Sequence, residues 1–155
     1  MLVGLSLSVG CGLSFPSTTV DSGLACSDFL ADWGKKPETL TFTGCDRVEN
    51  EQADKLVANY TVSGAEAEAV ENFLQTEFGM APLRFICCYW GTTTTNGQRY
   101  GHYTDASDND FSIDMYSAEA FVSEGDFQLP LIVEREDWEQ ISLFHVVAET
   151  YLEEI

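Results

Sequence analysis

Basic side chains are scarce in this sequence. Seven Lys and Arg residues stand against 26 Asp and Glu residues in a chain of 155, which gives a formal net charge of −19. The imbalance is steepest from Gly101 onward, where Arg135 is the single base among fourteen acids. Such a charge repels phosphate backbones and anionic lipid headgroups, so it disfavours binding to nucleic acid or to an anionic membrane. It would attract a basic partner or divalent cations, although the favoured explanation is that it keeps an exported protein soluble.

Motifs for catalysis and metal binding are also missing. The two histidines, His102 and His145, are better explained by packing or surface exposure than by catalysis, and neither a G-x-S-x-G elbow nor a C-x-x-C pair is present. The loop from Asp105 to Asp114 lacks the glycine and the final glutamate of an EF-hand, which favours an acidic turn over a calcium site. We therefore assign no catalytic residue, no metal site and no cofactor, and the sequence favours a non-enzymatic protein.

No apolar run is long enough to span a bilayer. The short apolar start, MLVGLSLSVGCG, is typical of an export signal, and Gly10 precedes Cys11 as in bacterial lipoprotein signals. Two features depart from that pattern: no Lys or Arg precedes Cys11, and Ser8 occupies a position that is usually aliphatic. A lipid anchor at Cys11 is favoured over an ordinary cleaved signal or a cytosolic start. We expect residues 1–23 to be signal and tether, and the protein to be exported to the periplasm or outer envelope, with membrane contact only through Cys11.

The cysteine count fits an exported, disulfide-stapled domain. Setting aside Cys11 leaves four cysteines, an even number that suggests two disulfides. These four residues are Cys26, Cys45, Cys87 and Cys88. If LRFICCYWG is one strand, its two adjacent cysteines point to opposite faces, so each can bond to a different layer. We therefore predict the pairs Cys26–Cys87 and Cys45–Cys88, with the swapped arrangement as the alternative. A direct Cys87–Cys88 bond is set aside because it needs a strained ring in a strand.

Hydrophobic periodicity predicts the fold class. A helix begins at the capping box Ser63 to Glu66 and ends at Gly79, with its apolar residues on one face, and residues 27–33 form a second, shorter helix. Alternating patterns predict the strands. The last of these segments could also be a helix, although its alternation favours a strand. The expected strands lie within residues 39–45, 55–62, 83–91, 99–105, 111–117, 129–135 and 142–152, with a helical turn at 136–141. The sequence thus predicts one α+β domain over residues 24–155, with about six or seven short strands in a mostly antiparallel sheet and two helices.

Four aromatic residues are candidates for a partner-binding surface. Asn96-Gly97 is a strong hairpin signal, and the hairpin would bring these aromatic side chains near one another. An exposed aromatic strip beside an acidic face could anchor a protein, although core packing is the favoured explanation. The four residues are Trp90, Tyr100, Tyr103 and Tyr116.

Three stretches together resemble an uncharacterised family of small bacterial exported proteins, a domain of unknown function often described as lipoproteins. They are CSDFLADWGKKPETLTFTGC, ANYTVSGAEAEAVENFLQTEFGM and FICCYW, and the similarity covers residues 26–155. The resemblance implies an envelope location but supplies no activity. We expect a non-enzymatic exported envelope protein that binds another macromolecule, most simply a protein. The alternative is an acidic, immunity-type inhibitor of a basic toxin or nuclease.

Overall fold

The computed structural model describes residues 12, 23–118, 123–124, 127–128 and 132–152. The predicted signal and tether, including Cys11, lie outside these ranges except for Gly12 and Gly23. Within the described part of the chain, no helix has the length and apolar character needed to cross a membrane.

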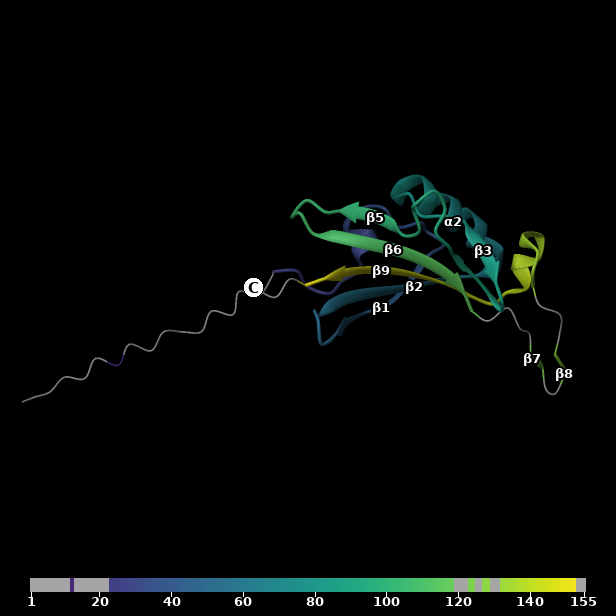
Figure 1. Cartoon of the computed structure of the whole chain (residues 1–155), viewed down its shortest axis with the longest axis horizontal. Helices are drawn as coiled ribbons and strands as arrows, with labels where there is room; N and C mark the ends of the chain where they lie inside the picture. Colours follow the sequence, from purple (N-terminus) through teal and green to yellow (C-terminus); the bar gives the residue numbers. More distant parts are fainter. Residues whose placement is uncertain (1–11, 13–22, 119–122, 125–126, 129–131, 153–155) are drawn as a thin grey trace, which may run out of the picture.

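Seven strands form one antiparallel sheet (Figure 1). Their spatial order is β1-β2-β9-β6-β4-β3, and β5 also pairs with β6. The strands are β1 (Thr41–Val48), β2 (Lys55–Val62), β3 (Leu83–Ile86), β4 (Tyr89–Thr92), β5 (Gly101–Thr104), β6 (Asp110–Ser117) and β9 (Phe144–Tyr151). A separate pair consists of β7 (Ser123–Glu124) and β8 (Phe127–Gln128).

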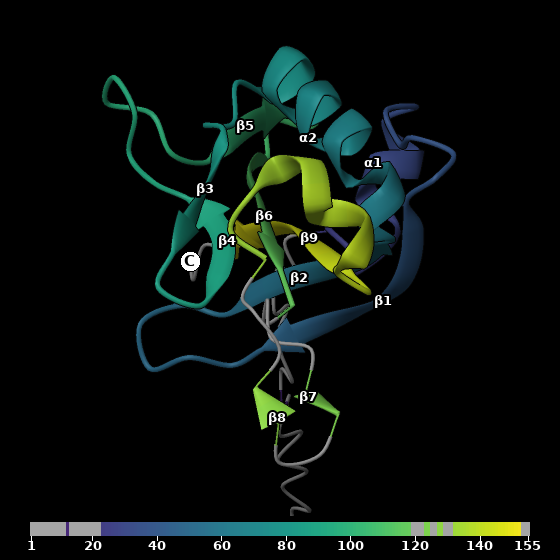
Figure 2. The same ribbon diagram turned by 90° about the vertical axis from the view of Figure 1, so that its right-hand side faces the viewer.

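Helices pack on one side of this sheet (Figure 2). They are α1 (Phe29–Asp32), α2 (Gly64–Phe78) and the 3₁₀ helix η1 (Arg135–Gln140). The prediction of an α+β fold with about six or seven short strands in a mostly antiparallel sheet is confirmed. The described chain has three helices where two were predicted, and the third, η1, is the helical turn expected at residues 136–141. Gly79 ends α2 in the left-handed conformation, as predicted, with φ of 71°. The Ser63 side chain, however, makes no capping hydrogen bond, and the Glu66 amide donates to the Ser63 carbonyl instead.

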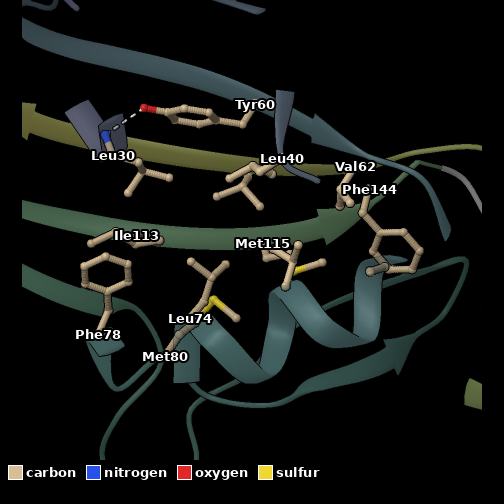
Figure 3. Close-up of a cluster of buried hydrophobic side chains, with 14 of the residues drawn as sticks. Leu30, Leu40, Tyr60, Val62, Leu74, Phe78, Met80, Ile113, Met115 and Phe144 are labelled. Atoms are coloured by element: carbon tan, nitrogen blue, oxygen red, sulfur yellow. Dashed lines mark hydrogen bonds between the residues drawn. The ribbon is translucent and has the colours of Figure 1, made fainter. Parts of the chain in front are cut away.

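The core lies between the sheet and these helices (Figure 3). Side chains alternate between buried and partly exposed along β2, β6 and β9, as expected for strands with only one covered face. Tyr60 reaches from β2 to α1, where its hydroxyl accepts a hydrogen bond of 3.1 Å from the Leu30 amide (Figure 3). The final segment is a strand because β2 and β6 flank it on both sides.

The prediction of one strand over residues 83–91 is wrong. The segment is a hairpin in which β3 and β4 pair, with Ile86 opposite Tyr89 and the two cysteines forming the turn between them. Cys87 has a φ of 55°, which is the left-handed conformation that tight hairpin turns require. A turn breaks the alternation of faces, so the two thiols do not point toward two different layers.

The predicted disulfide pairing is therefore also wrong. The cysteines lie at disulfide distance as Cys26–Cys45 and Cys87–Cys88, with Cα separations of 5.6 and 3.8 Å. Cys45 lies on the inner face of β1, because it is paired with the buried Ala58. This face lies toward the segment that leads into α1, which contains Cys26. One bond thus staples the N-terminal segment to β1, and the other closes a turn.

Two further strand predictions need correction. Within residues 129–135, Ile132 and Val133 have no regular structure and Arg135 opens η1, while 129–131 lie outside the described residues. The Asn96-Gly97 turn does form, between the bridged residues Thr95 and Gln98. The chain after it does not pair back onto β4, however, because β5 pairs with β6.

Candidate functional site

The most completely buried charged side chain among the described residues has a structural role. Glu71 on α2 accepts hydrogen bonds of 2.7 and 2.9 Å from the guanidinium of Arg135, and a third of 2.7 Å from the Leu83 amide. The Arg135 guanidinium lies 4.7 Å from the ring of Trp138 and 5.6 Å from that of Trp90. Both oxygens of the Glu71 carboxylate are thus engaged, and the pair ties α2 to β3 and η1. We do not consider it a reactive centre.

The opposite face of the sheet carries the exposed aromatic side chains. Among the described residues no helix covers this face (Figures 1 and 2). Its strands present polar and aromatic side chains that alternate with the buried ones, such as Asp114 and Tyr116 on either side of the buried Met115. The exposed tyrosines of the described chain are Tyr89, Tyr100, Tyr116 and Tyr151, with exposed fractions of 37%, 38%, 38% and 60%.

Two adjoining hollows on this face form what we call the tyrosine groove. They have volumes of about 360 and 200 Å³, and both are lined by Asp114 and Tyr116. The larger hollow is completed by Tyr89, Gly91, Thr92, Arg99 and Ser117. The smaller hollow is completed by Tyr100, Ser112, Val147 and Glu149. The groove therefore draws its lining from β4, β6, β9 and the segment before β5.

A hydroxyl group links the two charged side chains of the larger hollow. Thr92 donates a hydrogen bond of 2.7 Å to Oδ1 of Asp114, and its oxygen accepts one of 3.4 Å from Nε of Arg99. The Met115 amide also donates to Oδ1 of Asp114, at 2.9 Å. These bonds fix the carboxylate and leave Oδ2 without a hydrogen-bond partner among the described residues. A fixed acceptor thus lies beside a guanidinium that offers donors.

The tyrosine rings at the groove are supported from the side. The ring of Tyr116 stacks on His145, with centroids 5.3 Å apart, and the guanidinium of Arg99 lies 4.7 Å from the ring of Tyr100.

Glu149, in the smaller hollow of the groove, accepts a hydrogen bond of 3.0 Å from the ammonium group of Lys55. This hydrogen bond raises the pKa of Lys55 above its ordinary value, outweighing the opposing effect of burial. The ammonium group therefore stays charged and neutralises Glu149.

The structure brings together two of the four predicted aromatic residues. Tyr100 and Tyr116 both line the smaller hollow. Trp90 lies in the core at 5% exposure, where its indole donates to the Ile132 carbonyl at 2.8 Å. Tyr103 packs on the helical side of the sheet, with its ring 4.1 Å from that of Trp33. The predicted strip is thus divided between the two faces, and Trp90 and Tyr103 cannot contact a partner there.

The groove also contains residues that sequence reasoning missed. Arg99, Asp114 and Tyr89 come from different parts of the chain, and we had considered Asp114 only as part of an acidic loop. The period-two pattern of β6 could have identified Asp114, because it shares the outward face with Tyr116.

The other residues considered from the sequence lie apart from this site or have structural roles. Asp105 accepts hydrogen bonds from Ser107 and Asn109 in its own turn; burial raises its pKa, but these bonds lower it by more. His102 is exposed on β5, on the face opposite the core. Within the described ranges, no three His, Cys, Asp or Glu side chains are placed to hold a metal ion.

Comparison with known proteins identifies a family whose model matches part of this chain. Residues 16–90 match the model of a family described only as a domain of unknown function, DUF4952. Neither the curated proteins nor the solved structures contain a significant match. The expected similarity to an uncharacterised family is thereby supported, whereas bacterial origin and export stay predictions. The chain is thus similar to the DUF4952 family over the segment that holds α1, β1, β2, α2, β3 and the start of β4.

Proposed function

We propose that this protein is a non-enzymatic, exported protein of the cell envelope that binds another macromolecule through the tyrosine groove. The observation that carries the proposal is the gathering of all the exposed tyrosines of the described chain on one sheet face that no described helix covers. Tyrosine and arginine are enriched at binding surfaces, because they supply contact area and hydrogen bonds together. Three of these tyrosines and Arg99 line the groove.

Two observations support export. The apolar N-terminal stretch up to Cys11 fits a signal, and a lipid on Cys11 would hold the protein at the envelope. The cysteine pairs at disulfide distance fit an oxidising compartment, where disulfides persist. We place the protein in the periplasm or outer envelope on these grounds.

Site-specific crosslinking tests the binding surface. Photoreactive p-benzoylphenylalanine is introduced in place of Tyr116 in the groove or, as a control, in place of Asn72, which is exposed on α2. The expected result in intact cells is a discrete adduct from position 116 that position 72 does not give. The adduct should also weaken when Tyr100 is changed to Ala. No adduct at position 116, or equal adducts at both positions, contradicts the proposal.

A specific observation favours a second candidate, the acidic inhibitor of a basic toxin or nuclease. The start of α2 lies against η1, where the Gly64 amide donates to the Ile141 carbonyl at 3.2 Å. These two elements carry exposed acidic residues, namely Glu66 and Glu68 on α2, Glu134 just before η1, and Glu136, Asp137 and Glu139 on η1. Their field would speed capture of a basic protein.

The same crosslinker distinguishes the two candidates. Placed at Glu139, it should capture a basic protein if the inhibitor hypothesis is right. When the irradiation is carried out in about 1 M salt, where the Debye length falls to about 3 Å, that adduct should no longer form. An adduct at position 116 alone, retained in high salt, favours the groove.

A further inference from the structure

The tyrosine groove is nearly neutral, although the chain carries a net charge of −19. Its two carboxylates, Asp114 and Glu149, are matched by two cations, because Arg99 shares the Thr92 hydroxyl with Asp114 and Lys55 pairs with Glu149. A polycation or a polyanion therefore gains little net attraction here. The charges favour a ligand that is polar and uncharged.

The aromatic side chains suit a ligand with flat apolar faces. Tyr89, Tyr100 and Tyr116 each expose more than a third of their surface at the groove, and two of these rings are held in place by Arg99 and His145. A ring that is already ordered loses little side-chain entropy when a ligand packs on it. The C–H faces of a sugar ring are apolar and pack on such aromatic surfaces.

The polar groups suit the edges of the same kind of ligand. Oδ2 of Asp114 is an acceptor with no hydrogen bond among the described residues, and the guanidinium of Arg99 lies close to it through Thr92. Neighbouring hydroxyl groups on a sugar can donate to such a carboxylate and accept from such a guanidinium. The two hollows adjoin at Asp114 and Tyr116, so a ligand of linked units can occupy both.

We infer that the tyrosine groove binds an uncharged oligosaccharide chain, with its sugar rings packed on the tyrosines and its hydroxyl groups bonded to Asp114 and Arg99. This inference rests on the proposed function, because it names the class of macromolecule that the groove would take. The sugar faces and hydroxyl edges alternate along a glycan, and the groove lining offers aromatic and polar groups side by side.

Nuclear magnetic resonance titration of the full chain tests this inference. The probes are two neutral tetrasaccharides, cellotetraose and tetra-N-acetylchitotetraose, and the readout is the backbone amide shifts of Gly91, Thr92 and Ser117. We expect at least one probe to shift these amides with a dissociation constant on the order of 1 mM or lower. Tyr116→Ala should weaken binding at least about tenfold. Tyr151→Ala is the matched control, since Tyr151 is an exposed tyrosine of the same face that lines neither hollow, and binding should be unchanged.

Three results would overturn the inference. In the first, neither tetrasaccharide shifts a groove amide; in the second, the two tyrosine variants weaken binding equally. In the third, tetralysine or a heparin tetrasaccharide shifts the groove amides and the neutral probes do not. If position 116 still crosslinks to a protein in cells, only the oligosaccharide inference fails. If crosslinking fails as well, the proposed binding function fails with it.

Discussion

At the scale of single residues, Glu71 is a charged side chain with only 1% of its surface exposed. Burying a carboxylate is costly unless its hydrogen-bonding capacity is satisfied, and here Arg135 and the Leu83 amide satisfy it. The net stabilisation from such a pair is small, but removing one partner leaves the other without compensation. Glu71 and Arg135 are 64 residues apart, and nothing in the local sequence marks them as partners.

Glu71→Ala should therefore lower the free energy of unfolding by about 3 kcal/mol, because it leaves the Arg135 guanidinium and the Leu83 amide without their acceptor. Urea denaturation measures the change. Glu68→Ala, at an exposed position on the same helix, should change stability by no more than about 0.5 kcal/mol. Equal effects of the two substitutions would contradict the assigned role of Glu71.

Asp28 predicts a dependence of stability on pH. Burial raises its pKa, but hydrogen bonds from Lys36, the Ala31 amide and the Tyr60 hydroxyl together lower it by more, so the folded-state pKa lies below the ordinary value of 3.8. A carboxyl group with a lowered folded-state pKa stabilises the fold above its unfolded-state pKa and loses that effect as the pH falls through the folded-state value.

The stability difference between wild type and Asp28→Asn should thus be largest near neutral pH and shrink below about pH 4. Thermal unfolding at a series of pH values measures this difference. Thr39→Ala, at an exposed position nearby that carries no ionisable group, should give a difference that does not vary with pH. A difference for Asp28→Asn that stays constant down to pH 2 would show that folding does not lower the pKa of Asp28.

At the scale of secondary structure elements, the close contact between α2 and η1 is possible because Gly64 has no side chain. A Cβ atom at this position would overlap the backbone carbonyl oxygens of Trp138 and Ile141, and backbone atoms cannot move aside as a flexible side chain can. The helix therefore begins with a residue of poor helix propensity because a close approach requires it.

Gly64→Ala should lower the free energy of unfolding by at least about 2 kcal/mol, although alanine is the better helix former. Differential scanning calorimetry provides the test. The comparison variant Ala65→Ser adds one atom at the exposed neighbouring position and should have little effect. A Gly64→Ala protein as stable as wild type would mean that η1 does not need to lie this close to α2.

The two cysteine pairs should contribute unequally to stability. Cys26 and Cys45 are separated by 19 residues, and closing a loop of that length stabilises by about 3 kcal/mol in the chain-entropy model. Cys87 and Cys88 are adjacent, so their bond closes no comparable loop. The double change Cys26→Ser with Cys45→Ser should therefore destabilise the oxidised protein much more than Cys87→Ser with Cys88→Ser. Denaturation curves in oxidising buffer give both values, and the reverse order would contradict the assigned pairing.

Elements with a clear local signal could be predicted from the sequence, and those set by distant contacts could not. Alternation predicted β2 with its bounds, and Gly79 correctly marked the end of α2. The hairpin at Cys87 was missed because its turn has neither Gly nor Asn and lies within a continuous apolar run. For the site, Tyr100 and Tyr116 were predicted to lie together, but Glu149 joins them only through the sheet order, in which β9 lies beside β6. Local periodicity does not specify that order.

At the scale of the whole molecule, the proposed location and the cysteine chemistry can be tested together. Intact mass is measured for the full-length protein recovered from a bacterial host, with alkylation before and after reduction. We expect a mass increment of lipid size with Cys11 as the new N-terminus, and four cysteines that become alkylated only after reduction. An unprocessed chain with five free thiols would contradict both export and disulfide formation.

The sheet order also has consequences for folding during synthesis and for any protein that contains only the segment similar to DUF4952. The segment similar to DUF4952 contains β1 to β3 and reaches into β4, yet β9 and β6 separate β2 from β4 in the sheet. With neighbouring strands about 4.8 Å apart, that segment alone would leave a gap of about 14 Å through the middle of the sheet. On the ribosome, β2 has to wait with one edge unpaired until β9 has been synthesised. A protein that inherits only the matched segment and builds the same sheet has to obtain two central strands from elsewhere.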